Sequence, residues 1–155
     1  VAEDDRLFER LVFEINQAGL SWTTILNKAD NLRRAYDHFA IERVAAYGEA
    51  DIARLLADAG IIRNRRKIAA AIHNARVIRE LQAAHGSFRA WLDAQAGADK
   101  AVWVKLFKKT FAFTGPEITG EFLMSSGYLE GAHRRDCPVY TQILAAHPRW
   151  LTRGG

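Results

Sequence analysis

Helical periodicity runs through almost the whole of this 155-residue chain. Apolar residues recur at spacings of three and four, strict alternation is rare, and residues that favour helices are abundant. The pattern predicts an all-α protein, and the length suits a single domain over residues 1–155. The expected helices cover residues 4–18, 21–39, 41–47, 49–57, 65–84, 88–94, 100–110, 138–146 and a segment that starts at Pro116.

Glu14 lies on the apolar side of the first expected helix. At about 100° per residue it falls about 20° from Leu7 and about 60° from Leu11 on the helical wheel. Burying a bare carboxylate costs several kcal/mol, so we expect a polar group to meet it. The alternative is purely structural: Glu14 pairs with a core arginine or a backbone amide.

A sharp corner follows this helix. Gly19 can adopt the left-handed conformation that ends a helix, and Ser21 can cap the next one. We therefore expect Leu20 and Trp22 at a tight corner that reaches the surface, within nine residues of the buried acid. Packing of the Trp22 indole in the core is the alternative.

Basic residues gather in two parts of a chain whose formal net charge is +4. One cluster contains Arg63, Arg65 and Lys67, and the other contains Lys108 and Lys109. Together they predict a basic face suited to a polyanion, although a run of charge usually marks only a solvated surface.

The chain lacks the features of an exported or membrane protein. No apolar run reaches the roughly twenty residues that cross a bilayer, and no signal pattern opens the sequence. Cys137 is the only cysteine, so an intrachain disulfide is impossible. A reducing, cytoplasmic location is the expectation.

Residues 105–124 have the form helix, glycine-containing hairpin, helix. Backbone amides at the start of such a second helix can hold one phosphate, and Thr114 and Gly115 lie at that point, with Lys108 and Lys109 alongside. A packing turn filled by phenylalanines is an equally good interpretation of the hairpin.

His133 and Cys137 are four residues apart, as in half of a zinc site. A structural zinc site needs four ligands, and the sequence offers no second pair at a matching spacing. Capping or buried packing is therefore the default interpretation of these two residues.

Taken together, these motifs resemble the bacterial DNA-3-methyladenine glycosylase I family. The resemblance rests on order and spacing from about Asp5 to Cys137. The matching runs are Gln17-Ala18-Gly19-Leu20-Ser21-Trp22, then Ala59-Gly60-Ile61-Ile62-Arg63-Asn64-Arg65 with Lys67 and Asn74-Ala75-Arg76, and Phe111-x-Phe113-x-Gly115-Pro116.

The resemblance implies a helix-hairpin-helix glycosylase that flips an alkylated base out of duplex DNA and hydrolyses its N-glycosidic bond. In that family the matching glutamate hydrogen-bonds the flipped base and the matching tryptophan stacks on it, roles that fall on Glu14 and Trp22. Gln17, Gly19 and Leu20 would face the DNA, where Leu20 could fill the vacated stack. No lysine stands in these motifs as a nucleophile, so we expect base removal without strand cleavage.

The chain departs from the family in two respects. A family segment that precedes Asp5 and supplies a pocket tyrosine has no counterpart here, so the chain is expected to lack it. In many members that segment also supplies a cysteine and a histidine for zinc, leaving His133 and Cys137 as an incomplete pair. We therefore expect no cofactor for the chemistry and regard structural zinc as doubtful.

The expected partner is double-stranded DNA with alkylated bases, bound by a monomer. A non-catalytic helix-hairpin-helix DNA-binding module is the alternative that keeps the hairpin and the basic face. A helical domain with no DNA role is a third, and it predicts no salt-sensitive binding.

Overall fold

The computed structural model describes residues 2–17, 21–61 and 63–129, without the side chains of Ala2 and Trp22. Within these ranges every regular element is helical, which confirms the all-α prediction. The expected helix over 138–146 lies outside them. The elements are α1 (Ala2–Gln17), α2 (Trp22–Ala35), η1 (Asp37–Phe39), α3 (Ile41–Ala45), α4 (Glu49–Ala57), α5 (Arg65–His85), α6 (Phe88–Ala94), α7 (Lys100–Thr110) and α8 (Pro116–Ser125).

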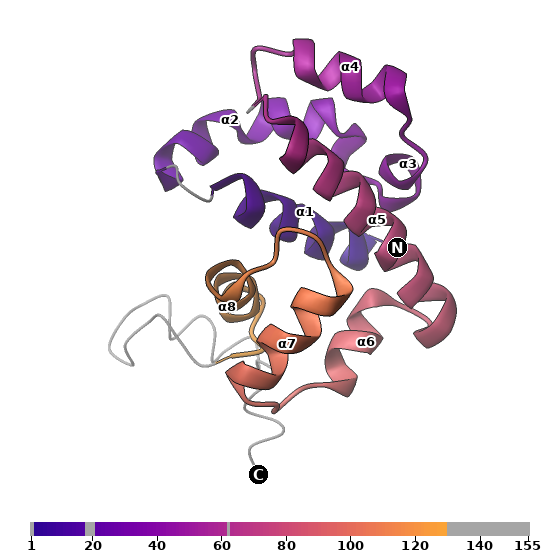
Figure 1. The fold of residues 1–155 in the computed structure, drawn as a ribbon, viewed down its shortest axis with the longest axis vertical. Coiled ribbons are helices and arrows are strands. Elements are labelled where there is room, and N and C mark those ends of the chain that lie inside the picture. Colours follow the sequence, from indigo (N-terminus) through magenta and orange to yellow (C-terminus); the bar gives the residue numbers. More distant parts are fainter. Residues whose placement is uncertain (1, 18–20, 62, 130–155) are drawn as a thin grey trace.

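Helix α1 lies at the centre of the molecule (Figure 1). It contacts α2, η1 and α3 as well as α5, α6 and α8. Its apolar stripe is buried as the periodicity predicts, with Phe8, Leu11 and Ile15 at most 1% exposed. Asp4 at its start is also buried and accepts hydrogen bonds from the backbone amides of Phe88 and Arg89, which ties α1 to the first turn of α6.

The second helix is shorter than the sequence indicates. Ser21 caps it as expected, since its hydroxyl accepts a hydrogen bond from the Thr24 amide at 3.1 Å. It ends at Ala35, however, because the next turn is η1, in which Asp37, His38 and Phe39 all have left-handed φ values. That turn brings Phe39 into the core.

Helix α5 is the longest of the described elements, covers the range that the sequence predicts and is capped at both ends. The Asn64 side chain accepts hydrogen bonds from the Arg66 and Lys67 amides. Gly86 ends the helix with a φ of 92°, a conformation that side chains rarely adopt. Helices α3, α4 and α6 pack on α5, and Figure 1 shows α5 passing alongside α1 through the middle of the fold.

An aromatic core joins the last three described helices. Phe107 contacts Trp91, Trp103, Phe111 and Phe122, with ring centroids 5.1–6.0 Å apart. This cluster fixes the turn between α7 and α8 relative to α6. None of the described helices is long and apolar enough to cross a membrane.

Candidate functional site

Glu14 points into the protein, as predicted. Only 5% of the residue is exposed, one turn before the end of α1. The expectation that a polar group of the protein meets this carboxylate is not confirmed, because no described residue forms a hydrogen bond or an ion pair with it.

Burial is also the main influence on the titration of Glu14. The pKa is raised from 4.5 to about 7, with burial as the largest cause and the negative charge of Glu121 on α8 as a smaller one. The positive charge of Arg10, one turn earlier on α1, lowers it. A buried carboxyl group whose pKa lies near neutrality, with no partner among the described residues, is typical of a functional position.

The last turn of α1 is held by α5. The Asn16 amide group donates to the Val12 carbonyl, and the Lys67 ammonium group donates to the Asn16 carbonyl at 3.3 Å. A cation at the end of a helix satisfies carbonyls that have no intrahelical partner. The end of α1, and with it Glu14, is thereby fixed to the first turn of α5.

Lys67 consequently differs from the other cations that were predicted to contact DNA. It is only 9% exposed, and burial lowers its pKa. The prediction grouped it with exposed cations because a sequence run does not reveal which residue faces the core. Its position supports the site from within rather than from the basic surface.

Part of the predicted corner falls outside the described residues. That holds for Gly19, Leu20 and the Trp22 side chain, so the aromatic lid over Glu14 stays a prediction. Gln17 is half-buried at the end of α1, and Ser21 is exposed at the start of α2. Helix α1 ends at Gln17 and α2 begins at Trp22, on either side of the predicted corner.

Two threonine hydroxyl groups form hydrogen bonds within the turn between α7 and α8. Thr114 is buried and donates to the Phe107 carbonyl at 2.9 Å, while the Thr119 hydroxyl donates to the Thr114 carbonyl at 3.1 Å. Gly115 is exposed immediately before α8, where no described side chain caps the helix. The side chain of Thr114 is thus structural, and Gly115 leaves the helix start open to solvent.

Asn74 of α5 clamps this turn. Its side-chain carbonyl accepts a hydrogen bond from the Ala112 amide at 2.7 Å, and its amide group donates to the Ala112 carbonyl at 3.0 Å. Asn74 had no predicted role of its own. A fully buried asparagine on the stripe of α5 is the signal that could have indicated one.

The tip of the α7–α8 turn contacts the first turn of α5. Phe113 has a φ of 62° and is 38% exposed, and the guanidinium of Arg66 lies 5.8 Å from its ring centroid. This contact brings the Arg63–Lys67 cluster beside the α7–α8 turn. Arg66 was not predicted to have this role.

The exposed cations flank that contact. Lys108 and Lys109 are exposed in the last turn of α7, and Arg63 and Arg65 are exposed at the start of α5. Arg65 also pairs with Glu49 at 3.4 Å. The two basic clusters of the sequence thus lie around one turn of the fold.

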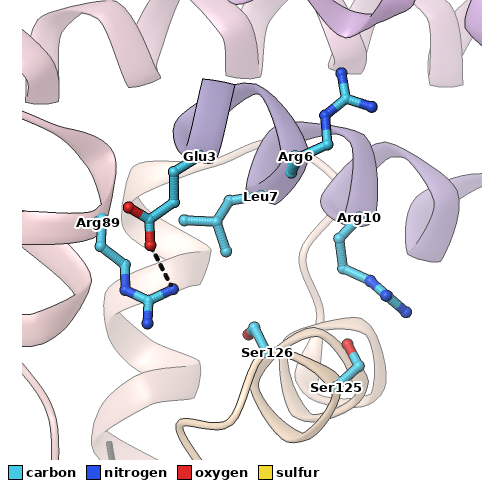
Figure 2. A pocket seen from close by; sticks show the side chains of 7 residues that line it. All are labelled: Glu3, Arg6, Leu7, Arg10, Arg89, Ser125 and Ser126. Carbon is cyan, nitrogen blue, oxygen red and sulfur yellow. Dashed lines mark ion pairs between the residues drawn. The ribbon is translucent and has the colours of Figure 1, made fainter. Parts of the chain in front are cut away.

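A cavity of about 210 Å³ lies between α1, α6 and the end of α8 (Figure 2). Arg10 and Ser125 line it from α1 and α8, and Arg89 forms an ion pair with Glu3 across it at 3.2 Å. The hydroxyls of Ser125 and Ser126 both donate to the Phe122 carbonyl.

The described residues contain no cluster of three or more side chains that could hold a metal ion. His133 and Cys137 lie beyond them, so the zinc expectation stays untested.

Comparisons with known proteins agree on one family. The profile of the family described as methyladenine glycosylase matches residues 1–105. DNA-3-methyladenine glycosylase 1 of Escherichia coli K12 is 33% identical over 157 residues, covering 89% of this chain and 83% of the relative. DNA-3-methyladenine glycosylase of Haemophilus influenzae is 27% identical and covers 90% and 85%.

Solved structures show the same likeness. A crystal structure of 3-methyladenine DNA glycosylase I superposes with a TM-score of 0.77 at 33% identity, over 87% of this chain and 84% of the other. A variant of such an enzyme in complex with 3-methyladenine has a TM-score of 0.77 at 30% identity, with 87% and 82% coverage. The Staphylococcus aureus enzyme scores 0.76 at 30% identity, with 87% and 81% coverage. The chain therefore belongs to the methyladenine glycosylase family.

Proposed function

We propose that the protein is a DNA glycosylase that removes 3-methyladenine from duplex DNA by hydrolysing its N-glycosidic bond. The observation that carries the proposal is the Glu14 carboxylate, which is buried and has no partner among the described residues. A donor brought by the substrate would compensate for the cost of burying it.

The substrate supplies that donor. Adenine presents an exocyclic amino group, and N3 methylation gives the ring a positive charge while it is attached to deoxyribose. A carboxylate favours both features, since hydrogen bonds to a charged acceptor are roughly twice as strong as neutral ones. The indole of Trp22, by family resemblance, would stack on the cationic ring.

The chemistry needs little further machinery. When the bond between C1′ and the base nitrogen breaks, its electron pair neutralises the ring, so the base departs without a proton from a general acid. Water adds to the oxocarbenium-like sugar at C1′ and loses its proton to solvent. Extruding the base costs a few kcal/mol, least for a damaged one, so selection of the flipped base is the main task of the site.

The DNA backbone would lie over the turn between α7 and α8. The uncapped start of α8 at Gly115 offers backbone amides to one phosphate, and the backbone of Thr114 precedes it. Lys108 and Lys109 stand on one side, and Arg63 and Arg65 on the other. Gln17, Gly19 and Leu20 would then meet the duplex at the flipped base, with Leu20 in the vacated stack.

We further propose that the protein acts as a monomer on chromosomal DNA, which in bacteria lies in the cytoplasm. No cofactor takes part in the steps above. The pair His133 and Cys137 would require two more ligands to hold zinc.

The role of Glu14 is tested by replacing it with glutamine. Glu14→Gln should still bind DNA that contains 3-methyladenine, because the basic surface is intact, but should lose most excision. The measurement is single-turnover release of the free base alongside DNA affinity. Glu42→Gln, an exposed change on α3, is the matched control. Excision by Glu14→Gln at the unmodified rate would remove Glu14 from the mechanism.

The same experiment separates the enzyme from a non-catalytic DNA-binding module. Both would bind DNA with an affinity that falls steeply with salt. Only the enzyme releases base, so a protein that binds methylated DNA and releases nothing would support the module.

A further inference from the structure

We propose that Glu121 is a specificity-determining residue, whose carboxylate makes the surroundings of Glu14 net negative and so favours a cationic base over a neutral base of the same shape. The inference rests on the proposed function and adds a second acidic group to that site.

The placement of Glu121 follows from the packing of α8 on α1. Arg10 of α1 and Ser125 of α8 line the same cavity, with both side chains visible there in Figure 2. Glu14 follows Arg10 by four residues, and Glu121 precedes Ser125 by four. Residues four apart share one face of a helix, so both acids lie one turn from that cavity on the facing sides of α1 and α8.

Glu14 and Glu121 also interact electrostatically. The charge of Glu121 raises the pKa of Glu14, whereas Arg10 lowers it. Lys67, from α5, directs its ammonium group to the Asn16 carbonyl instead. Among the charged side chains that the structure describes, Glu121 and Arg10 are thus the two that act on Glu14.

This group of three charges is unbalanced. Two carboxylates and one guanidinium sum to a formal charge of −1 when all are ionised. Glu121 is exposed to solvent and forms no hydrogen bond or ion pair with another described residue, so none of them pairs with it directly. The imbalance favours a ligand that brings one positive charge and gives no comparable gain to a neutral ligand.

The effect should appear in binding more than in the chemical step. The positive charge leaves the base as the glycosidic bond breaks, so attraction to Glu121 is strongest before cleavage. Interactions of this kind change KM more than kcat. Glu121 is therefore distinct from Glu14, for which we expect a loss of excision itself.

The test compares a cationic and a neutral base in otherwise identical DNA. One duplex contains 3-methyladenine, and the other contains 3-deaza-3-methyladenine, which has the same shape without the charge. Glu121→Gln should raise KM for the first about threefold, as expected for an exposed charge, while the dissociation constant for the second stays unchanged. Glu121→Asp, which keeps the charge, should retain most of the selectivity.

A matched control and a pH profile sharpen the result. Glu80→Gln removes an exposed carboxylate from α5. It should leave unchanged the ratio of the dissociation constant for the neutral duplex to the KM for the cationic duplex. Removing the like charge beside Glu14 should also move the acidic limb of the activity profile to lower pH. That shift would not follow from loss of packing alone.

The outcomes are distinguishable. If the unmodified protein releases no 3-methyladenine, the proposed function fails. If it is active and Glu121→Gln changes neither the KM for the cationic duplex nor its ratio to the dissociation constant for the neutral duplex, the inference about Glu121 is overturned while the function stands.

Discussion

Glu14 is ionised in the unfolded chain at neutral pH, where water surrounds it, whereas burial in the folded protein raises its pKa to about 7. Below about pH 4.5 the group is protonated in both states and does not affect stability. Between pH 4.5 and 7 the folded state holds a proton that the unfolded state has lost, so the free energy of unfolding falls as the pH rises. Above pH 7 the free energy of unfolding stays lowered by a constant amount. The acid that the proposed function requires therefore destabilises the fold at neutral pH.

Replacing Glu14 by glutamine should relieve this cost. Glu14→Gln should raise the free energy of unfolding at pH 8 by about 2–3 kcal/mol and change it little at pH 5. Urea unfolding at the two pH values measures the difference, with Glu42→Gln as the exposed control. An equal effect at both pH values would show that the carboxylate is not held in a desolvated position.

At the scale of elements, the sequence predicts helix caps well, but it predicts poorly the hydrogen bonds between residues that are far apart along the chain. Ser21 was expected to cap a helix, and the structure confirms it; Asn64 and Ser87 cap helices in the same way, since each accepts from an amide two or three residues away. Asp4 and Asn74 went unrecognised because their partners lie 84 and 38 residues along the chain. Only the folded arrangement of α1, α5 and α6 brings those groups together.

The Asn74 clamp should control the turn between α7 and α8. Asn74→Ala removes both hydrogen bonds to Ala112 in a buried position, and we expect a loss of about 2–3 kcal/mol in the free energy of unfolding. Hydrogen exchange of the Ala112 amide should accelerate by more than global unfolding explains. His73→Ala, an exposed change on the same helix, is the control. Unchanged exchange at Ala112 would show that α7 and α8 hold the turn without α5.

At the scale of the whole molecule, α1 and α5 place an internal acid and an external basic surface on one framework. Lys67 joins α1 to α5 from within, and Arg66 joins α5 to the α7–α8 turn through Phe113. The sequence located both charge clusters but could not distinguish the inward lysine from its exposed neighbours. Periodicity did orient Glu14 correctly, since the stripe on which it lies is continuous.

The basic surface should govern affinity for DNA of any sequence. Replacing both Lys108 and Lys109 by alanine should weaken binding equally for damaged and undamaged duplexes. It should also reduce the slope of log affinity against log salt by about 2, because each phosphate contact releases about one counterion. Arg43→Ala on α3 is the control, and Figure 1 shows α3 well apart from α7. An unchanged slope would place the DNA elsewhere.

The central claim is that this fold removes a cationic base without cutting the strand. Duplex DNA methylated at adenine N3 should be incubated with the protein and the products separated by chromatography. We predict free 3-methyladenine together with an intact strand that breaks only on later alkaline treatment, which is the pattern of a monofunctional glycosylase. DNA that is bound but yields no free 3-methyladenine would contradict the account.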